Sequence, residues 1–214
     1  AVLGAIALNG VRLARLGLGD TALVIGLGLI GQITVSLLKA QGCRVFATDP
    51  DPGRCETAVK MGADGAAPQL SAADVEGRTG GLGADAVLIA AATKSDAPAE
   101  LAGNAVRKKG RVVVVGAVGM NLPRRPYYFK EAELVVACSY GPGRYDAEYE
   151  ERGHDYPAAY VRWTEQRNLQ AVLDLMAQGS LNVAPLISHR FPIEQALEAY
   201  TLVETGSGPY LGLV

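Results

Sequence analysis

A glycine-rich turn between an apolar segment and a helical pattern is the feature that most constrains this chain. The segment TALVIGLGLIG places Gly26, Gly28 and Gly31 in a G-x-G-x-x-G arrangement directly after a predicted strand. A second apolar run, residues 45–48, follows the helical pattern and ends at Asp49. A strand, a glycine turn, a helix, a second strand and an acidic residue in this order are typical of a dinucleotide-binding βαβ unit.

Each part of the turn has a distinct expected role. Gly26 permits the tight turn, Gly28 lets the backbone approach a pyrophosphate, and Gly31 lets the helix pack closely on the strand. The pyrophosphate would accept hydrogen bonds from N–H groups at the start of the helix, at Leu29 and Ile30, where the helix dipole favours an anion. The alternative is a crossover in which the glycines serve packing alone.

The residue at the end of the second strand indicates which dinucleotide is bound. The carboxylate of Asp49 can accept hydrogen bonds from both ribose hydroxyls of NAD and would repel the additional phosphate of NADP. Arg54 lies one turn into the next predicted helix and could face that phosphate. Because Asp49 is nearer, the sequence favours NAD over NADP.

Strand and helix patterns alternate along the chain after an opening helix, which predicts parallel strands joined by crossover helices. The predicted strands are apolar throughout, as expected where helices cover both faces of a sheet; they are residues 23–25, 45–48, 65–67, 86–90, 112–115 and 134–137. Helices are predicted at residues 29–40, 53–61, 72–78, 97–105 and 168–178. The predicted fold is an α/β doubly wound parallel sheet of the Rossmann type, with the ligand crevice at the carboxyl ends of the strands.

Small residues follow the fourth and fifth predicted strands, which leaves room for a ligand close to the backbone. Ala92 and Thr93 follow the fourth strand, and the fifth is followed by Gly116, Ala117 and Val118. Main-chain groups at these positions could hold a flat carboxamide such as that of nicotinamide. The alternative is that the small residues only pack against a neighbouring helix.

Charge and cysteine content argue against several classes of protein. The 20 basic and 22 acidic residues of this 214-residue chain nearly cancel and are interspersed, which does not favour binding to nucleic acid or to a membrane surface. We also find no apolar run near the roughly 20 residues that span a bilayer. The cysteines and histidines are isolated from one another, so we expect reduced thiols in a cytoplasmic protein and no metal site; they are Cys43, Cys55, Cys138, His154 and His189.

The two ends of the sequence predict an excised segment of a longer protein. Ala1 begins inside a helical pattern without a Met, and the last residues stop within a strand-like run. We expect a dinucleotide-binding domain over residues 1–180 and a C-terminal return segment over residues 181–214.

Several motifs taken together resemble the medium-chain dehydrogenases and reductases, the superfamily of zinc-type alcohol dehydrogenases. The matching pieces occur in order over nearly the whole chain: Gly19-Asp20, residues 26–31, Asp49, and residues 54–64, 83–87, 109–116 and 185–196. The resemblance implies the nucleotide-binding domain of an NAD-dependent dehydrogenase, with a return toward an N-terminal catalytic domain that this sequence lacks. Many relatives carry a zinc-binding Cys near the position of Ala1. No Cys occurs before Cys43 in this chain, so zinc is not expected in it.

Residues 140–163 depart from the ordinary family pattern, because they form a long, polar and Tyr-rich insert. With the residues that follow, the insert resembles a subgroup of bacterial bi-domain oxidoreductases, in which a medium-chain dehydrogenase half precedes a second oxidoreductase half. Tyr rings would suit a polyhydroxylated substrate, such as a sugar or nucleotide-sugar derivative. Arg144, Arg162 and Arg167 could contact an acidic group, and His154 could transfer a proton. A subunit interface and plain surface packing are the alternatives.

The predicted function is the NAD(H)-binding part of an alcohol or sugar dehydrogenase, in which hydride passes between nicotinamide and an alcohol or carbonyl carbon. We expect this chain to bind NAD(H) with little turnover alone, and the sequence does not identify catalytic residues. The alternative is a non-catalytic nucleotide-binding module, such as a redox sensor or scaffold. A homodimer is expected, paired through an edge strand near residues 122–136.

Overall fold

The computed structural model describes residues 1–206 and 208–214. The chain divides into two compact units, Ala1–Leu181 and Asn182–Val214. The first unit contains a six-stranded sheet, and the second contains a two-stranded sheet.

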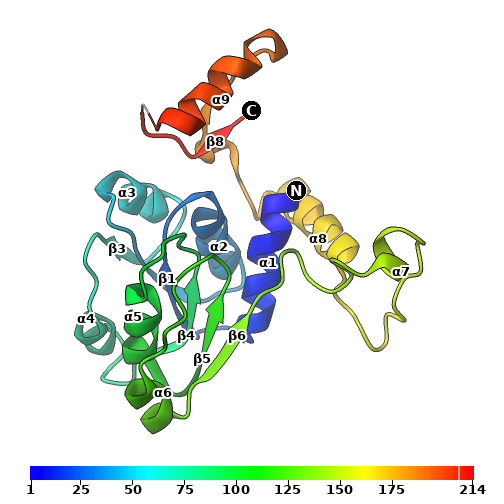
Figure 1. The fold of residues 1–214 in the computed structure, drawn as a ribbon. Helices are drawn as coiled ribbons and strands as arrows, with labels where there is room; N and C mark the ends of the chain where they lie inside the picture. Colours follow the sequence, from blue (N-terminus) through cyan, green and yellow to red (C-terminus); the bar gives the residue numbers. More distant parts are fainter. Residues whose placement is uncertain (207) are drawn as a thin grey trace. The chain divides into compact units, whose positions relative to one another are not determined.

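Six parallel strands form the sheet of the first unit, in the order β3-β2-β1-β4-β5-β6 (Figure 1). They are β1 (Thr21–Ile25), β2 (Arg44–Thr48), β3 (Gly65–Ala67), β4 (Ala84–Ile89), β5 (Val106–Val114) and β6 (Glu133–Val136). The direction of the strand order reverses between β1 and β4, which opens a crevice at the carboxyl ends of these strands. The predicted doubly wound α/β fold is therefore confirmed.

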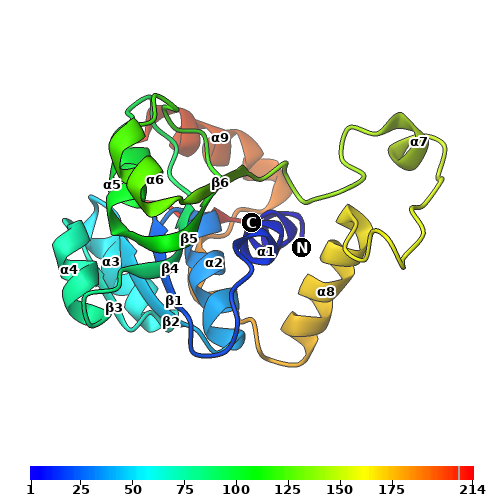
Figure 2. The ribbon, with the colours of Figure 1, turned by 90° about the horizontal axis from the view of Figure 1, so that it is seen from below.

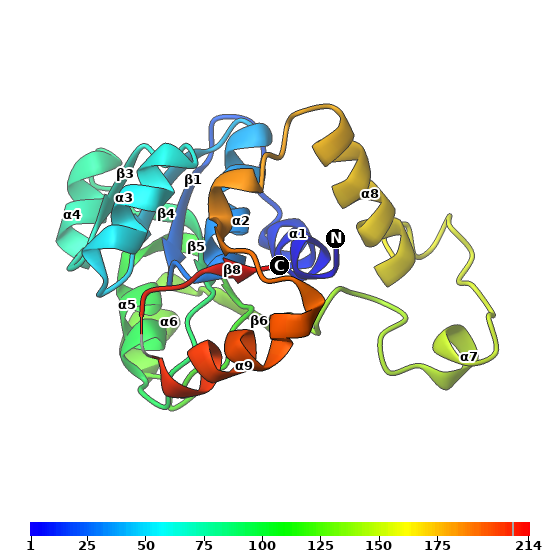
Figure 3. The same ribbon diagram turned by 90° about the horizontal axis from the view of Figure 1, so that it is seen from above.

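Helices cover both faces of this sheet (Figure 2). One face carries α1 (Val2–Ala14), α2 (Leu29–Ala40) and α3 (Pro52–Lys60), and the other carries α4 (Ala72–Arg78), α5 (Ala97–Ala105) and α6 (Arg124–Lys130). Figure 3 shows α1 between α2 and α8 (Glu165–Ala177). The bounds of α2, α4 and α5 are those predicted from the sequence.

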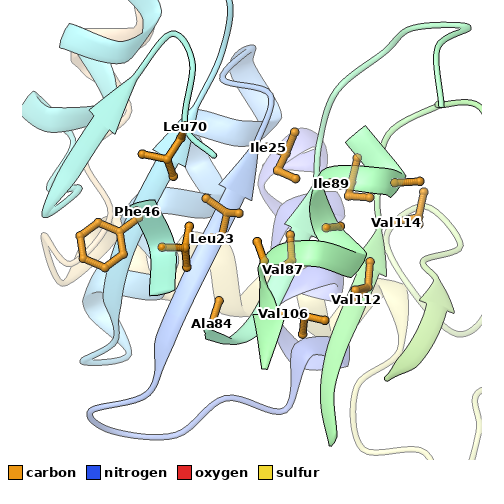
Figure 4. Close-up of a cluster of buried hydrophobic side chains, with 14 residues drawn as sticks. Leu23, Ile25, Phe46, Leu70, Ala84, Val87, Ile89, Val106, Val112 and Val114 are labelled. Atoms are coloured by element: carbon orange, nitrogen blue, oxygen red, sulfur yellow. The ribbon is translucent and has the colours of Figure 1, made fainter. Parts of the chain in front are cut away.

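Alternate residues of the central strands point into a hydrophobic cluster beneath α4 and α5 (Figure 4). Leu23 of β1 and both Val87 and Ile89 of β4 have no exposed surface. The residues between them on β1 and β4 are buried on the opposite face, which α1 and α2 cover. Burial on both faces explains why these strands are apolar throughout, and it makes them a rigid support for the turns that follow them.

The segment of residues 122–136 differs from the predicted edge strand. Only Glu133–Val136 is a strand, whereas Arg124–Lys130 is the helix α6. Pro126 lies in the first turn of α6, where a helix tolerates proline because its first N–H groups have no intrahelical partner. The phenol of Tyr127 donates to the carbonyl of Ala99 at 2.8 Å, and its ring fills the space beside Gly103, so α6 is fixed against α5.

The fifth strand also begins earlier than predicted, at Val106 instead of residue 112. Val106 pairs with Ala84, and the register then shifts before the pairing of Arg111 with Ala86. Lys109 has a positive φ of 62° within this irregular part of the strand. The charged residues at positions 107–109 interrupt the apolar pattern, so the sequence does not predict this part of the strand.

The Tyr-rich insert leaves the sheet after β6 and is fixed at its start by two buried asparagines. Asn9 of α1 donates from Nδ2 to the carbonyl of Ser139 at 3.0 Å, and Asn168 of α8 donates to the carbonyl of Tyr140 at 2.9 Å. Beyond these contacts the chain extends away from the sheet and forms the single-turn helix α7 (Ala147–Glu150) (Figure 2). α1 and α8 thus hold the start of the insert.

The second unit consists of the parallel pair β7 (Ile187–His189) and β8 (Gly212–Leu213), joined through α9 (Ala196–Thr205). The N–H of Phe191 donates to the carbonyl of Val214 at 2.8 Å, which fixes the end of the described chain within this unit. In neither described range is any helix long and apolar enough to cross a membrane.

Candidate functional site at the carboxyl ends of the strands

Two glycines of the turn are required by the protein's own packing. Gly26 has a φ of +92°, and a Cβ atom there would lie 2.5 Å from the backbone nitrogen of Ala91. A Cβ atom at Gly31 would lie 2.0 Å from the carbonyl oxygen of Gly26. Only glycine fits either position, because the clashing atoms belong to the backbone.

Gly28 differs from its two neighbours in the motif. Its φ of −64° and ψ of −175° are accessible to any residue. Apart from Gly28 and its two chain neighbours, no described residue has an atom within 4 Å of a Cβ atom built there. The folded chain therefore does not itself require glycine at this position, and the empty space is available to a ligand.

A cavity of about 780 Å³ lies against the turn. It is bounded by the ends of β1, β2 and β4, by the loop after β3, and by the first turns of α3 and α5. Six of the predicted site residues line it: Gly26, Gly28, Asp49, Arg54, Ala92 and Thr93. The topology thus brings together residues that lie far apart in the sequence.

Part of the cavity wall was not predicted. Six further lining residues come from the loops after β2 and β3 and from α5. Five are apolar and one carries an amide: Pro50, Pro68, Gln69, Leu70, Pro98 and Leu101. The signal for part of this wall was available, since residues 65–67 were predicted as a strand and its carboxyl end must lie at the same edge of the sheet.

Leu29 and Ile30 form the first turn of α2 and are not among the residues that line this cavity. The helix begins at the N-cap residue Gly28, which offers no side-chain acceptor to the N–H groups of that turn. Such N–H groups lack intrahelical acceptors and carry the positive end of the helix dipole. N–H groups of this kind can bind an anion, and anion binding at Leu29 and Ile30 stays a prediction.

The segment after β5 has a different role from the turn after β1. A Cβ atom at Gly116 would lie 2.1 Å from the carbonyl oxygen of Ala91, so glycine is needed there for packing. The carbonyl of Ala117 accepts from the N–H of Thr93 at 2.9 Å, which joins the loops after β4 and β5. Gly116, Ala117 and Val118 do not line the 780 Å³ cavity. A contact of these residues with nicotinamide stays a prediction.

Asp49 is buried at the end of β2, with 6% of its surface exposed. Its Oδ2 accepts from the N–H of Leu27 at 2.7 Å, and its Oδ1 accepts from the N–H of Asp51 at 3.0 Å. A carboxylate oxygen can accept two hydrogen bonds, so both oxygens keep capacity for a ligand.

Arg54 lies between two carboxylates at the wall of the cavity. One guanidinium nitrogen is 3.7 Å from Oδ2 of Asp49, and Nε is 3.7 Å from Oδ2 of Asp51. Asp51 also caps α3, because its Oδ1 accepts from the N–H of Gly53 at 2.8 Å. The positive charge of Arg54 is therefore balanced at this end of the cavity.

Burial favours the neutral thiol form of two of the cysteines, Cys43 and Cys55. Burial raises the pKa of Cys55, whose Sγ lies 3.3 Å from the carbonyl oxygen of Asp49. Burial likewise raises the pKa of Cys43, while Cys138 is exposed. Raised thiol pKa values disfavour the thiolate that metals and electrophiles require.

No group of three His, Cys, Asp or Glu residues within residues 1–206 and 208–214 is arranged to hold a metal ion. Nδ1 of His154 lies 2.9 Å from Oε2 of Glu148, and the ring of His189 stacks on the ring of Phe191. The described residues therefore do not fit a zinc site.

The polar residues of the insert mostly contact one another. Tyr149 stacks on Tyr156 with 5.5 Å between the ring centroids, and its hydroxyl donates to Thr164 at 3.0 Å. Each of the three arginines that the sequence suggests as anion ligands already has a partner in the insert. Arg144 pairs with Glu150, Arg167 pairs with Asp155, and Cζ of Arg162 lies 4.0 Å from the ring centroid of Trp163. Non-covalent contacts between its own side chains therefore stabilise the insert. A role of the insert toward a substrate stays a prediction.

The strand order, the glycine turn and the cavity at the switch between β1 and β4 define a doubly wound α/β domain of the Rossmann class. The family model described as "Zinc-binding dehydrogenase" matches residues 30–152, more than half of the chain. The chain belongs to this zinc-binding dehydrogenase family.

Individual relatives agree with this assignment. D-guloside 3-dehydrogenase of Escherichia coli (strain K12) is 30% identical over 203 residues, which are 91% of this chain and 53% of the relative. Sorbitol dehydrogenase of Homo sapiens is 30% identical over 210 residues, 95% of this chain and 52% of the relative. The solved structure of alcohol dehydrogenase TADH from Thermus sp. ATN1 superposes with a TM-score of 0.77 at 25% identity, covering 99% of this chain and 55% of the other. The chain spans about half the length of the curated relatives it matches.

Proposed function

We propose that this chain is the NAD(H)-binding domain of an alcohol or sugar dehydrogenase. The observation that carries the proposal is the open space at Gly28, beside a cavity that also contains Asp49. A glycine that the folded chain does not need is explained if a pyrophosphate occupies the space that a side chain would take.

The residues at this site fit the parts of NAD. The N–H groups of Leu29 and Ile30 would hold the pyrophosphate, and the remaining acceptor capacity of Asp49 would bind the adenosine ribose. Leu70 and Leu101 would provide apolar contacts for the adenine ring. The charge of Arg54 is partly balanced by Asp49 and Asp51, each with a carboxylate oxygen 3.7 Å from the guanidinium, which supports NAD over NADP.

The domain assignment follows from these roles. Residues 1–180 form the dinucleotide-binding domain with its insert at residues 140–163, and residues 181–214 form a return segment. When bound, the nicotinamide accepts or donates hydride, while this chain binds and orients the cofactor. The similarity to D-guloside and sorbitol dehydrogenases supports a polyhydroxylated alcohol as the substrate class. Low catalytic turnover by this chain alone is part of the proposal.

Three further parts of the proposal concern the cellular setting of the chain. The free cysteines Cys43, Cys55 and Cys138 support a reducing, cytoplasmic location. The position of β6 at the edge of the sheet supports a homodimer in which the edges of two copies meet. The sequence of the Tyr-rich insert supports membership of this chain in the subgroup of bacterial bi-domain oxidoreductases.

Calorimetric titration of the chain with NADH and with NADPH tests the cofactor assignment. We expect binding of both, with tighter binding of NADH. The absence of heat with either would refute nucleotide binding, and tighter binding of NADPH would refute the role given to Asp49. Oxidation of sorbitol in the presence of NAD, followed at 340 nm, tests turnover; rapid turnover by the chain alone would refute the proposal that it needs residues beyond this domain.

A further inference from the structure

Gln32 is a fully buried polar side chain of α2, adjacent to Gly31, with no exposed surface. Its Nε2 donates to the carbonyl oxygen of Leu27 at 3.1 Å and to that of Arg54 at 2.8 Å. A single amide group therefore joins the glycine turn to the first part of α3, and both lie at the cavity.

These contacts form a closed circuit of four residues. Asp49 accepts from the N–H of Leu27 at 2.7 Å, and Gln32 donates to the carbonyl of the same residue. The guanidinium of Arg54 lies 3.7 Å from Asp49, and the carbonyl of Arg54 accepts from Gln32. Gln32 is thus the link between the backbone of the turn and the backbone that carries Arg54.

The side-chain amide of Gln32 also has a cost in folding free energy. Oε1 of Gln32 is buried and has no hydrogen-bond partner among the described residues. A buried polar atom without a partner is unfavourable, and an unbranched apolar side chain such as Met would fill similar space without this cost. The gain from two hydrogen bonds is partly cancelled, so stability alone is a weak explanation for glutamine at this position.

We infer that Gln32 is a positioning residue that sets the preference for NAD over NADP, an inference that rests on the proposed nucleotide-binding function. By holding the backbone of Arg54 against the turn, Gln32 keeps the guanidinium paired with Asp49 and Asp51. Without the tether, the first part of α3 can shift, and Arg54 can turn toward the position of an additional phosphate on the ribose.

Ser36 provides a matched control on the same face of α2. It lies one turn beyond Gln32, and its Oγ donates to the carbonyl of Met61 at 3.2 Å, at the far end of α3. Both residues tether α3 to α2 through a carbonyl, but neither Ser36 nor Met61 lines the cavity. Loss of the Ser36 tether should loosen α3 without affecting Arg54.

The test is fluorescence titration of NADH and NADPH into the wild-type chain and the variants Gln32→Met, Gln32→Leu and Ser36→Ala, with thermal unfolding of each. We expect Gln32→Met to reduce the ratio of NADH to NADPH affinity about three- to tenfold, the range for loss of about one hydrogen bond. Ser36→Ala should leave the ratio unchanged. Gln32→Leu should reproduce the effect of Met, and it decides the outcome if Gln32→Met does not fold.

Each result has a distinct meaning. If wild-type chain binds neither nucleotide, the proposed function itself fails. If wild-type chain binds NADH and the Gln32 variants keep its affinity ratio, or Ser36→Ala changes the ratio equally, the positioning role is refuted while the proposed function stands. A purely structural role would weaken both nucleotides by the same factor and would leave the ratio unaffected.

Discussion

The carboxylate of Asp49 accepts a hydrogen bond from the backbone N–H of Leu27, with 2.7 Å between Oδ2 and the nitrogen. This bond joins the end of β2 to the middle of the glycine turn, and both residues are buried. Asp49 therefore contributes to the shape of the turn, in addition to the ribose contact that we propose. The two contributions can be separated by mutation.

Asp49→Asn keeps an oxygen that can accept from Leu27 but removes the negative charge. We expect it to lower the ratio of NADH to NADPH affinity at least about tenfold, equivalent to about 1.4 kcal/mol. Asp49→Ala also leaves the Leu27 N–H without a partner, at a cost of about 1–3 kcal/mol in unfolding free energy. Nucleotide titration and urea unfolding of both variants provide the measurements, and an unchanged ratio in Asp49→Asn would contradict the ribose contact.

Gly28→Ala and Gly26→Ala form a second pair with opposite expectations. At Gly28 an added methyl group meets no described atom, so unfolding free energy should change by less than about 1 kcal/mol, while NADH affinity falls at least about tenfold. At Gly26 the positive φ and the 2.5 Å approach to Ala91 should destabilise the fold by about 2–4 kcal/mol. Full NADH affinity in Gly28→Ala would show that the open space is not used by the cofactor.

Val136→Lys tests the dimer proposed through β6. The side chain of Val136 is 61% exposed, on a strand that pairs only with β5 among the described strands. A lysine at an edge strand opposes pairing of two edges, so we expect sedimentation velocity to show a shift from dimer to monomer. Leu173→Lys, on the exposed side of α8, is the control and should leave the association state unchanged. A wild-type chain that sediments as a monomer would contradict the proposed dimer.

Asp64 should contribute an acid-sensitive part of the stability. Burial raises its pKa, but hydrogen bonds from Lys39 at 2.8 Å and the N–H of Val45 at 2.7 Å outweigh burial, so the pKa lies below 3.8. Because the folded-state pKa is below the unfolded one, this stabilisation is complete above the unfolded pKa and is lost as the pH falls through the folded pKa.

Urea unfolding of wild type and Asp64→Asn between pH 6 and pH 3 measures this contribution. We expect wild type to lose more stability on acidification than the variant, because asparagine does not titrate. Lys39→Met should reduce the acid dependence as well, since it removes one of the two donors that lower the pKa. Parallel curves for wild type and Asp64→Asn would show that the ion pair does not affect the folded-state pKa.

The sequence was most informative where local pattern and final environment agree. Helix α2 has its predicted bounds, because an apolar face and a glycine turn are both local signals. Helix α6 was missed, because the aromatic and basic residues around Pro126 resemble an irregular edge strand. The contact of Tyr127 with α5, which holds this helix, is visible only in the folded structure. Gln32 was also missed, since nothing in the local pattern shows that its amide reaches two carbonyls on different segments.

The sequence by itself determined the Rossmann fold, the family resemblance and the edge of the sheet where a ligand would lie, because the periodicity of strands and helices is encoded locally. Only the tertiary structure decided that packing requires glycine at Gly116 and does not require it at Gly28. A Cβ atom at Gly26 or Gly116 would clash with the backbone of Ala91, and one at Gly31 with the carbonyl of Gly26, whereas Gly28 faces open space. The physical reason is that a clash depends on atoms brought close by folding, and the distance between them is not present in the order of residues.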